Sequence, residues 1–317
     1  MPRFLVTGGA GFVGSNIVEA LVARGEDVVV FDDLSTGKRE NIEPFVSKIR
    51  FIEGDICDAG AVARAMEGVD FVAHQAALPS VPRSVADPVA SNRAQVDGTL
   101  NVLIAARDAG VRRVIYAGSS SAYGDTERLP KTESMPPRPL SPYAVGKLTG
   151  EYYCKVFHAL YGLETVVLRY FNVFGPRQNP ASRYSAVVPL FISAALEGRQ
   201  PTIHGDGLQS RDFTYVDNVV SANLLACTAP GAAGEVINVA CGERTSVLDI
   251  ARHIAGLLGV DFRPEHTEPR PGDVRHSQAD ITKARRLLGY EPSVGVKEGL
   301  AKTVGWHRKA GSGNVRR

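Results

Sequence analysis

Apolar and polar positions follow two different periods through the first half of the chain. Short apolar runs predict strands, and they alternate with stretches whose apolar residues recur every three or four positions, which predict helices. We predict strands at 4–6, 28–31, 49–53, 69–74, 113–117 and 164–170, and helices at 14–24, 96–109 and 143–161. Such alternation indicates an α/β fold with a parallel sheet covered on both faces. The run 28–31 contains no polar residue, as expected for a strand buried on both faces.

The second half of the chain has a different pattern, because proline and glycine become frequent and the apolar runs become shorter. We therefore predict a larger domain at 1–172 and a smaller lobe at 173–310. An apolar helix expected over 212–228 lies in a segment, near 212–240, that we expect to return to the larger domain. The polar end at 311–317 is predicted to be disordered.

A glycine motif lies where the first predicted strand meets the first predicted helix. Gly8, Gly11 and Gly14 form the pattern G-x-x-G-x-x-G in this turn. Glycine is needed because a side chain would keep the backbone away from a pyrophosphate, and because the helix must pack close to the strand. The N-terminus of the helix then offers free N–H groups and a partial positive charge to the anion. The motif therefore predicts a dinucleotide site.

The second predicted strand leads into Asp32, at the place where a carboxylate accepts hydrogen bonds from a ribose diol. A 2′-phosphate would meet a like charge there, so NAD is favoured over NADP, although Lys38 and Arg39 follow closely. Asp55, after the third strand, is a candidate partner for the adenine amino group. The alternative for Asp55 is an ordinary turn aspartate.

Three polar side chains predict a catalytic group. Tyr143 and Lys147 are four residues apart on a predicted helix, so both lie on one face, and Ser119 follows a predicted strand. Removing the proton of a sugar hydroxyl needs a base with a pKa near neutrality, whereas a free tyrosine has a pKa of about 10. A nearby ammonium and a positive nicotinamide ring favour the phenolate. We predict that Tyr143 is the base, that Lys147 activates it and that Ser119 binds the reacting oxygen.

Composition excludes several classes of protein and adds no further site. The chain has 317 residues, of which 44% are hydrophobic and 22% charged, typical of a globular protein. Its net charge of +2 gives no reason to expect nucleic acid or a membrane surface as a partner. The four cysteines lack metal-ligand spacing, so we expect reduced thiols and no metal. We also expect no signal peptide and no membrane span, hence a cytoplasmic location.

The motifs together resemble an extended short-chain dehydrogenase/reductase, from Met1 to about Trp306. Besides the glycine motif, the resemblance rests on the Ser-rich stretch 119–121 before Tyr123-Gly124, on 141–147, on 169–178 and on 210–213. The chain is most similar to the bacterial UDP-N-acetylglucosamine 4-epimerases and UDP-glucose 4-epimerases. The resemblance implies a Rossmann-type doubly wound parallel sheet with a smaller C-terminal nucleotide-sugar-binding lobe. It also implies tightly bound NAD and a homodimer with a four-helix interface, formed by 96–109 and 143–161 of each subunit.

The resemblance also implies binding residues for the cofactor and the UDP-sugar. The residues implied for the cofactor are Gly8, Gly11, Phe12, Val13, Gly14, Asp32, Asp33, Lys38, Asp55, Ile56, Gln75, Ala76, Ala77, Asn92, Tyr143, Lys147 and Tyr170. Those implied for the substrate are Ser120, Ser121, Asn172, Val187, Val188, Thr202, His204, Arg211, Arg270, Asp273 and Ser277. Arginine suits the diphosphate because it is always charged and donates to two oxygens at once. The family often has Asn where this chain has Gln95, so this position is a departure from the pattern.

The Ser-rich stretch favours one reaction among those that the family catalyses. Relatives that eliminate water carry Asp-Glu after the catalytic hydroxyl, and decarboxylases keep a Glu, whereas 119–123 has no carboxylate. This favours an NAD-dependent UDP-hexose 4-epimerase, an isomerase that works through a 4-keto sugar. Ser277 takes the place of a bulky tyrosine in relatives and favours a 2-acetamido sugar, hence interconversion of UDP-GlcNAc and UDP-GalNAc in polysaccharide biosynthesis. UDP-glucose or UDP-glucuronate 4-epimerase is the alternative, and a non-catalytic NAD-binding protein a third possibility.

Overall fold

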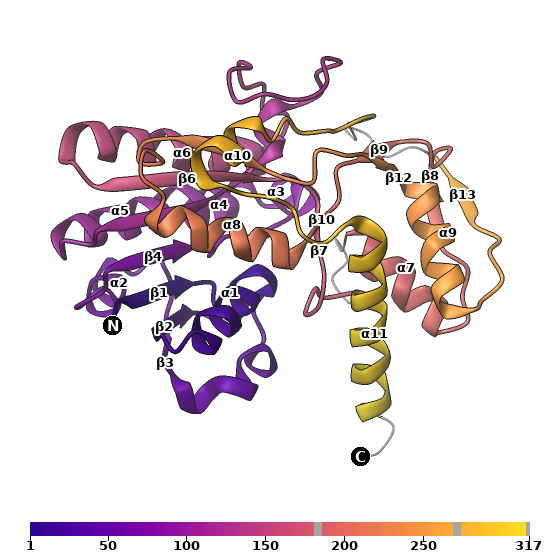
Figure 1. Ribbon diagram of the computed structural model, residues 1–317, viewed down its shortest axis with the longest axis horizontal. Coiled ribbons are helices and arrows are strands. Elements are labelled where there is room, and N and C mark those ends of the chain that lie inside the picture. Colours follow the sequence, from indigo (N-terminus) through magenta and orange to yellow (C-terminus); the bar gives the residue numbers. More distant parts are fainter. Residues whose placement is uncertain (181–185, 269–273, 315–317) are drawn as a thin grey trace.

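The computed structural model describes residues 1–180, 186–268 and 274–314 (Figure 1). Within these residues, seven parallel strands form the central sheet in the order β11-β6-β5-β4-β1-β2-β3. The strands are β1 (Arg3–Thr7), β2 (Asp27–Asp32), β3 (Ile49–Glu53), β4 (Phe71–His74), β5 (Arg113–Ser119), β6 (Glu164–Tyr170) and β11 (Val236–Val239). The α/β class and the doubly wound parallel sheet expected from the sequence are confirmed.

The order of the strands reverses at β1, because β2 lies on one side of it and β4 on the other. Open α/β sheets bind ligands at such a switch point, in the crevice beyond the carboxyl ends of the strands. The glycine turn follows β1, and the stretch from Gln75 onward follows β4, so both meet at this place.

Helices cover both faces of the sheet, as the alternating pattern predicts. Alternate residues of each strand point to opposite faces. One face packs against α1 (Phe12–Ala23) and α8 (Val216–Thr228), and the other against α2 (Ala59–Ala65), α5 (Gly98–Asp108) and α6 (Pro142–Tyr161). The short helices α3 (Val81–Ala86), α4 (Pro88–Asn92), the 3-10 helices η1 (Arg39–Asn41), η2 (Glu43–Lys48) and η4 (Ser120–Tyr123), and the π-helical turn η3 (Arg93–Asp97) complete this half.

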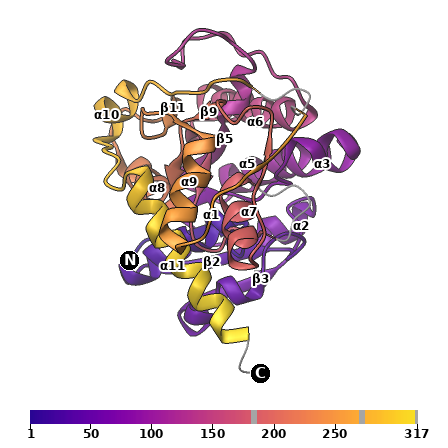
Figure 2. The same cartoon turned by 90° about the vertical axis from the view of Figure 1, so that its right-hand side faces the viewer.

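The second half contributes a group of helices beside the sheet. There α7 (Val187–Leu196), α9 (Val247–Leu258) and α11 (Val296–Asn314) pack against one another (Figure 2), while α10 (Thr282–Leu288) lies against β11. The short strands are β7 (Val173–Phe174), β8 (Thr202–His204), β9 (Ser210–Arg211), β10 (Thr214–Tyr215), β12 (Thr245–Ser246) and β13 (Glu265–Thr267). The chain returns to the sheet through α8 and β11, within the segment near 212–240.

Two boundaries differ from the sequence-based expectation. The helix expected from Asp212 begins at Val216, because Thr214 and Tyr215 pair with β7 and the Asp212 carboxylate accepts three backbone N–H groups. Helix α11 runs to Asn314, beyond the start of the tail predicted to be disordered at Gly311.

Candidate active site

The glycine turn between β1 and α1 brings the backbone against the loop that follows β4. Gly8 has a φ of 66°, a left-handed conformation that favours glycine. A Cβ on Gly8 would lie 2.7 Å from the Ala76 nitrogen, and one on Gly14 would overlap the carbonyl oxygen of Gly8. These two positions therefore accept only glycine, and the turn presents bare backbone beyond the end of β1.

The N-terminus of α1 opens onto this turn. Its N-cap residue is Gly11, and no side chain caps the first N–H groups. Phe12 and Val13, in the first turn, are half-buried. Unsatisfied N–H groups and the helix dipole favour an anion at this place. The turn and the helix end together fit a pyrophosphate.

Asp32 lies at the end of β2 beside the same turn and is 6% exposed. Its Oδ2 accepts from the Ala10 N–H at 2.9 Å and its Oδ1 from the Leu34 N–H at 2.8 Å. Burial raises the pKa of this carboxyl, and the two N–H donors oppose that shift. Each carboxylate oxygen keeps a second lone pair, so Asp32 can still accept from a ribose diol.

Tyr143 stands in the first turn of α6, which Ser141 and Ser84 cap. The Ser141 hydroxyl accepts from the Ala144 N–H at 3.2 Å, and the Ser84 hydroxyl accepts from the Tyr143 N–H at 3.0 Å. The Ser119 hydroxyl, at the end of β5, lies close enough to the phenol to influence its pKa. Burial raises the pKa of Tyr143, and the Ser119 hydroxyl opposes that shift. The phenol therefore needs a nearby positive charge before it can act as a base near neutral pH.

Lys147 supplies a charge one turn further along α6. It is 5% exposed, its Nζ donates to the Ala117 carbonyl at 2.9 Å, and it lies 5.1 Å from the centre of the Tyr116 ring. Burial lowers the pKa of this ammonium to about 8. Because Ala117 belongs to β5, this hydrogen bond fixes Lys147 to the strand that ends at Ser119.

A buried ion pair holds α6 against the next strand. Glu151, on α6, accepts two hydrogen bonds from Arg169 of β6 at 2.9 and 2.7 Å, and each side chain is 3% exposed. The guanidinium also stacks 4.6 Å from the centre of the Tyr123 ring, in the turn that follows Ser119. Charged hydrogen bonds in two parallel contacts give a strong geometric constraint. The pair therefore fixes the catalytic helix relative to the Ser-rich turn.

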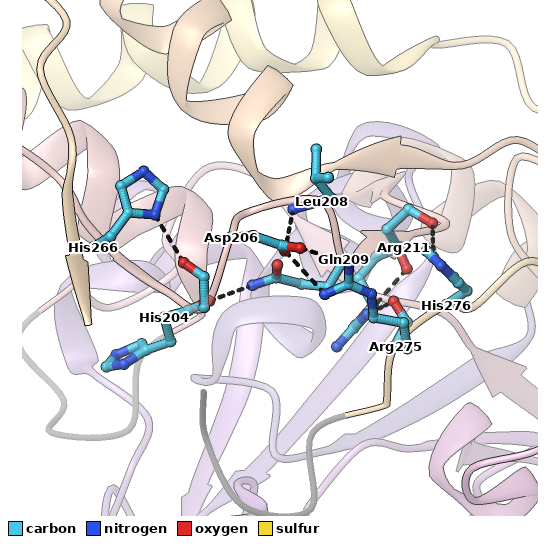
Figure 3. A network of polar contacts seen from close by, with 10 residues as sticks. His204, Asp206, Leu208, Gln209, Arg211, His266, Arg275 and His276 are labelled. Atoms are coloured by element: carbon cyan, nitrogen blue, oxygen red, sulfur yellow. Dashed lines mark hydrogen bonds and ion pairs between the residues drawn. The ribbon is translucent and has the colours of Figure 1, made fainter. Parts of the chain in front are cut away.

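Two of the predicted substrate residues, His204 and Arg211, lie in a polar network of the second half (Figure 3). Arg211 donates to the carbonyls of Ser210 and Arg275 at 3.0 and 3.2 Å. Arg275 is paired with Asp206 through two contacts of 2.9 and 2.7 Å, and the Ser210 hydroxyl lies 2.8 Å from His276 Nδ1. The segments 204–211 and 275–277 are thus tied side by side, although about 65 residues separate them.

Comparison with known proteins identifies the relatives of this arrangement. The family model described as "NAD dependent epimerase/dehydratase family" matches residues 4–240. The UDP-glucose 4-epimerase of Mycolicibacterium smegmatis is 43% identical, over 96% of this chain and 98% of that protein.

The chain belongs to the NAD-dependent epimerase/dehydratase family.

Solved structures of the same family superpose over nearly the whole chain. The UDP-N-acetylglucosamine 4-epimerase of Methanobrevibacter ruminantium, in complex with UDP-N-acetylmuramic acid, has a TM-score of 0.93 at 41% identity and covers 98% of this chain and 99% of its own. The Thermus thermophilus UDP-glucose 4-epimerase, in complex with NAD, has a TM-score of 0.89 at 38% identity, with 97% and 99% covered. The cofactor of this enzyme family is NAD, and the bare glycine turn and the uncapped helix end fit its pyrophosphate.

Most of the other residues expected to bind the cofactor lie after the carboxyl ends of strands, whereas Asn92 ends α4, and their exposure varies. Gln75, Ala76, Ala77 and Tyr170 are half-buried, Ile56 is buried, and Asp33, Lys38, Asp55 and Asn92 are exposed. The Asp55 carboxylate accepts from the Cys57 N–H at 2.8 Å, the turn geometry that was the alternative explanation for this residue. Asn92 lies in a surface pocket with Pro88 and Arg93, whereas Gln95 is buried and donates to the Leu78 carbonyl at 3.2 Å.

The residues expected to bind the sugar differ in the elements they belong to and in how exposed they are. Ser120 and Ser121 are half-buried in η4, Asn172 is exposed with a φ of 24°, and Ser277 is 6% exposed. Thr202 is exposed on β8 and His204 is half-buried there, while Val187 is half-buried at the start of α7. Val188 is packed in the core, which leaves only its backbone to a ligand. Arg270 and Asp273 lie outside the described residues.

Sequence reasoning missed a buried polar chain beneath the glycine turn. His74 Nδ1 lies 2.7 Å from the Thr7 hydroxyl, and its Nε2 lies 3.1 Å from the Thr99 hydroxyl. Burial lowers the pKa of His74 to about 3, and the Lys147 charge adds to this effect, so the ring stays neutral. The signal for these contacts in the sequence was a polar residue, His74, directly after the apolar run 71–73. These hydrogen bonds join β1, β4 and α5 beneath the glycine turn.

Among the described residues, none of the helices is both long enough and apolar enough to span a bilayer. All four cysteines are free thiols in the structure.

Proposed function

We propose that this protein is a UDP-hexose 4-epimerase that interconverts UDP-GlcNAc and UDP-GalNAc through a 4-keto intermediate, with tightly held NAD. The observation that carries the proposal is the juxtaposition of Tyr143, Lys147 and Ser119 at the end of β5, beside the glycine turn. Related structures of a UDP-N-acetylglucosamine 4-epimerase and a UDP-glucose 4-epimerase support the reaction class.

In the proposed mechanism, Tyr143 takes the proton of the sugar O4. We assign to Lys147, one turn further along α6, the role of favouring the phenolate, and to Ser119 the role of donating to the reacting oxygen and holding it in place. The glycine turn, the N-terminus of α1 and Asp32 would hold NAD, which would supply reversible hydride transfer at C4 of the sugar. For the configuration at C4 to invert, the hexose must turn between oxidation and reduction, so the protein has to hold the nucleotide firmly and the sugar loosely. Arg211 is the described side chain that we assign to the diphosphate.

The Ser-rich turn supports epimerisation over elimination or decarboxylation. The family includes a dTDP-glucose 4,6-dehydratase from Streptomyces griseus, 36% identical, and a UDP-N-acetylglucosaminuronate decarboxylase from Bacillus cytotoxicus, 32% identical. Elimination after oxidation at C4 needs a base for C5 and an acid for the departing hydroxyl. The stretch Ser119-Ser120-Ser121-Ala122-Tyr123 offers no carboxylate for either task.

The burial of Ser277 supports a 2-acetamido sugar. This residue is 6% exposed and its N–H donates to the Ser210 carbonyl at 3.0 Å, so it does not face bulk solvent. Its neighbour Arg211 is the proposed diphosphate ligand, which puts Ser277 within reach of the hexose. A small hydroxymethyl group there leaves room for an acetamido group. The second candidate is UDP-glucose, favoured by the Mycolicibacterium relative, and UDP-glucuronate remains an alternative substrate.

We also infer a homodimer through α5 and α6. The exposed side of α6 carries Val145, Tyr152, Val156 and Leu160, which recur at helical spacing, and Val89 of α4 is exposed nearby. An apolar stripe of this kind marks an interface rather than a solvated surface. A second copy of the chain, with α5 and α6 packed on their equivalents, would cover it. Sedimentation of the wild type as a dimer and of Val156→Glu as a monomer is the expected result, and a monomeric wild type would contradict it.

The proposed activity is tested with the purified holoenzyme and no added cofactor. UDP-GlcNAc, UDP-glucose and UDP-glucuronate are incubated separately, and the products are identified by NMR. We expect UDP-GalNAc from the first at the highest kcat/KM. Turnover of UDP-glucuronate alone would contradict the assignment of Ser277, and elimination products from any of the three would contradict epimerisation.

A further inference from the structure

Three polar side chains from distant elements meet at the carboxyl end of the sheet. They are Gln75 after β4, Tyr170 at the end of β6 and Asn223 on α8. Asn223 is 1% exposed and lies on the helix side that packs against the sheet, among apolar residues such as Val219 and Ala226. A buried amide is costly unless it is hydrogen-bonded, so its partners decide what it does.

The partners of Asn223 leave it a single orientation. Its Nδ2 donates to the Val219 carbonyl at 2.8 Å and to the Tyr170 hydroxyl at 2.8 Å. Its Oδ1 accepts from Gln75 Nε2 at 3.2 Å. Turning the amide over would place its oxygen against the Val219 carbonyl, which has no proton to donate. The backbone of α8 therefore determines which atom Asn223 presents to each neighbour.

The three side chains form a closed ring of hydrogen bonds. Asn223 Nδ2 donates to the Tyr170 hydroxyl, and Gln75 Nε2 lies 3.2 Å from both Asn223 Oδ1 and the Tyr170 oxygen. The Tyr170 hydroxyl in turn donates to Asn223 Oδ1 at 3.0 Å or to Gln75 Oε1 at 3.3 Å. Burial raises the pKa of Tyr170 to about 12, so its hydroxyl keeps the proton that the ring requires. The ring in turn sets which way the Gln75 amide points, and it leaves one N–H and one lone pair of that amide for another partner.

The ring lies beside the proposed chemistry. Tyr170 is the register partner of Ser119 in the pairing of β5 with β6. Gln75 precedes Ala76, whose nitrogen touches the glycine turn at Gly8. The half-buried faces of Gln75 and Tyr170 therefore border the end of the cleft where the reacting ring of the dinucleotide must meet the sugar.

We propose that Asn223 is a positioning residue, which acts through Gln75 and Tyr170 to hold the reacting end of the cofactor in place. It touches neither cofactor nor substrate, because it is buried under both partners. The predicted loss of turnover rests on the proposed epimerase activity, whereas the predicted loss of NAD rests only on the family's use of this cofactor.

The test compares Asn223→Leu with Asn218→Leu in the holoenzyme. Asn218 lies on the same helix and is equally buried, and within the described part of the chain its amide bonds only the Val294 backbone and, weakly, Cys241. Both variants should lose thermal stability. Only Asn223→Leu should lower kcat, by about tenfold to a hundredfold as expected for a misplaced reacting group, with KM nearly unchanged. It should also retain less NAD after gel filtration than the Asn218 variant.

Two further variants keep the proposal falsifiable. Asn223→Asp preserves the size of the side chain but cannot donate to Tyr170, so it should reproduce the loss of kcat. In Tyr170→Phe combined with Asn223→Leu, the combined loss should be smaller than the product of the two single losses, because Asn223 acts in part through that hydroxyl. Equal kcat per NAD-loaded subunit in the Asn223 and Asn218 variants would overturn the proposal. So would a double variant in which the losses of Asn223→Leu and Tyr170→Phe multiply as independent effects. If the wild type converted no UDP-sugar, the proposed function would fail, and NAD retention would still test Asn223.

Discussion

The two ends of the proposed cleft are built in different ways. The cofactor end consists of bare backbone at Gly8 and Gly14 and of buried side chains on packed elements, such as Lys147 and the Glu151–Arg169 pair. The nucleotide-sugar end consists of side chains on short strands, where the Asp206–Arg275 ion pair is exposed. The contrast suggests that the chemistry depends on rigid core structure, whereas the choice of sugar depends on residues that can change without disturbing the fold. The following predictions test that division.

The largest effect is expected for Tyr143→Phe. Loss of the base should lower kcat by about a thousandfold, within the range for general acid–base catalysis, while NAD content stays that of the wild type. Tyr153→Phe, also on α6 but packed against the core, serves as the control and should keep its activity. Undiminished turnover of Tyr143→Phe would remove this residue as the base.

Gly14→Ala should empty the cofactor site. The new methyl group would overlap the Gly8 carbonyl and lie 2.8 Å from the Gly9 Cα, so the turn must open. Displacing two charged hydrogen bonds, each of about 1.5–3 kcal/mol, should reduce NAD affinity at least about a hundredfold, measured as NAD per subunit after dialysis. Gly256→Ala on α9 is the matched control, because a Cβ there meets no atom and should leave NAD content unchanged. Full retention by Gly14→Ala would contradict the proposed site.

Ser277→Tyr should change the choice of sugar without affecting the cofactor. The ring would fill the space assigned to the acetamido group, so kcat/KM for UDP-GlcNAc should fall about a hundredfold and that for UDP-glucose far less. NAD content and melting temperature report whether the cofactor end is intact. An equal loss for both sugars would show that Ser277 does not border the C2 substituent.

The smallest effect is a pH dependence. Burial lowers the pKa of Lys147 to about 8, so the ammonium is present below that pH and is lost above it. Since the ammonium favours the Tyr143 phenolate, kcat should decline above pH about 8. Arginine stays charged at all these pH values, so Lys147→Arg should be slower but should lack the alkaline decline. The same decline in both proteins would assign it to another group.

The sequence was sufficient to predict the strands and the glycine turn at the expected cofactor end, because their signals are local. Strand bounds such as Ile49–Glu53 and Glu164–Tyr170 follow from short stretches rich in apolar residues, and the glycine turn from three spaced residues. Lys147 and Tyr143 share a helix face through simple periodicity.

The rest of the fold and of the candidate site depends on contacts between residues that are far apart in the sequence. Gln75 and Asn223 are 148 positions apart, and no local pattern indicates that they touch. The helix predicted from Asp212 begins at Val216, because the Asp212 carboxylate binds the N–H groups of Cys241, Gly242 and Ala279 instead. Helix α9 was not predicted, because glycine and proline are frequent in the second half of the chain and we expected irregular structure there. The apolar residues of α9 nevertheless follow a helical period.

The central claim is that the hydrogen on C4 of the sugar leaves and returns within one active site, while Tyr143 moves only the hydroxyl proton. UDP-GlcNAc carrying deuterium at C4 of the hexosamine, incubated with the holoenzyme in ordinary water, tests it directly by NMR and mass spectrometry of the UDP-GalNAc formed. The account predicts product that keeps its deuterium at C4. Product with hydrogen from water at that carbon would contradict it.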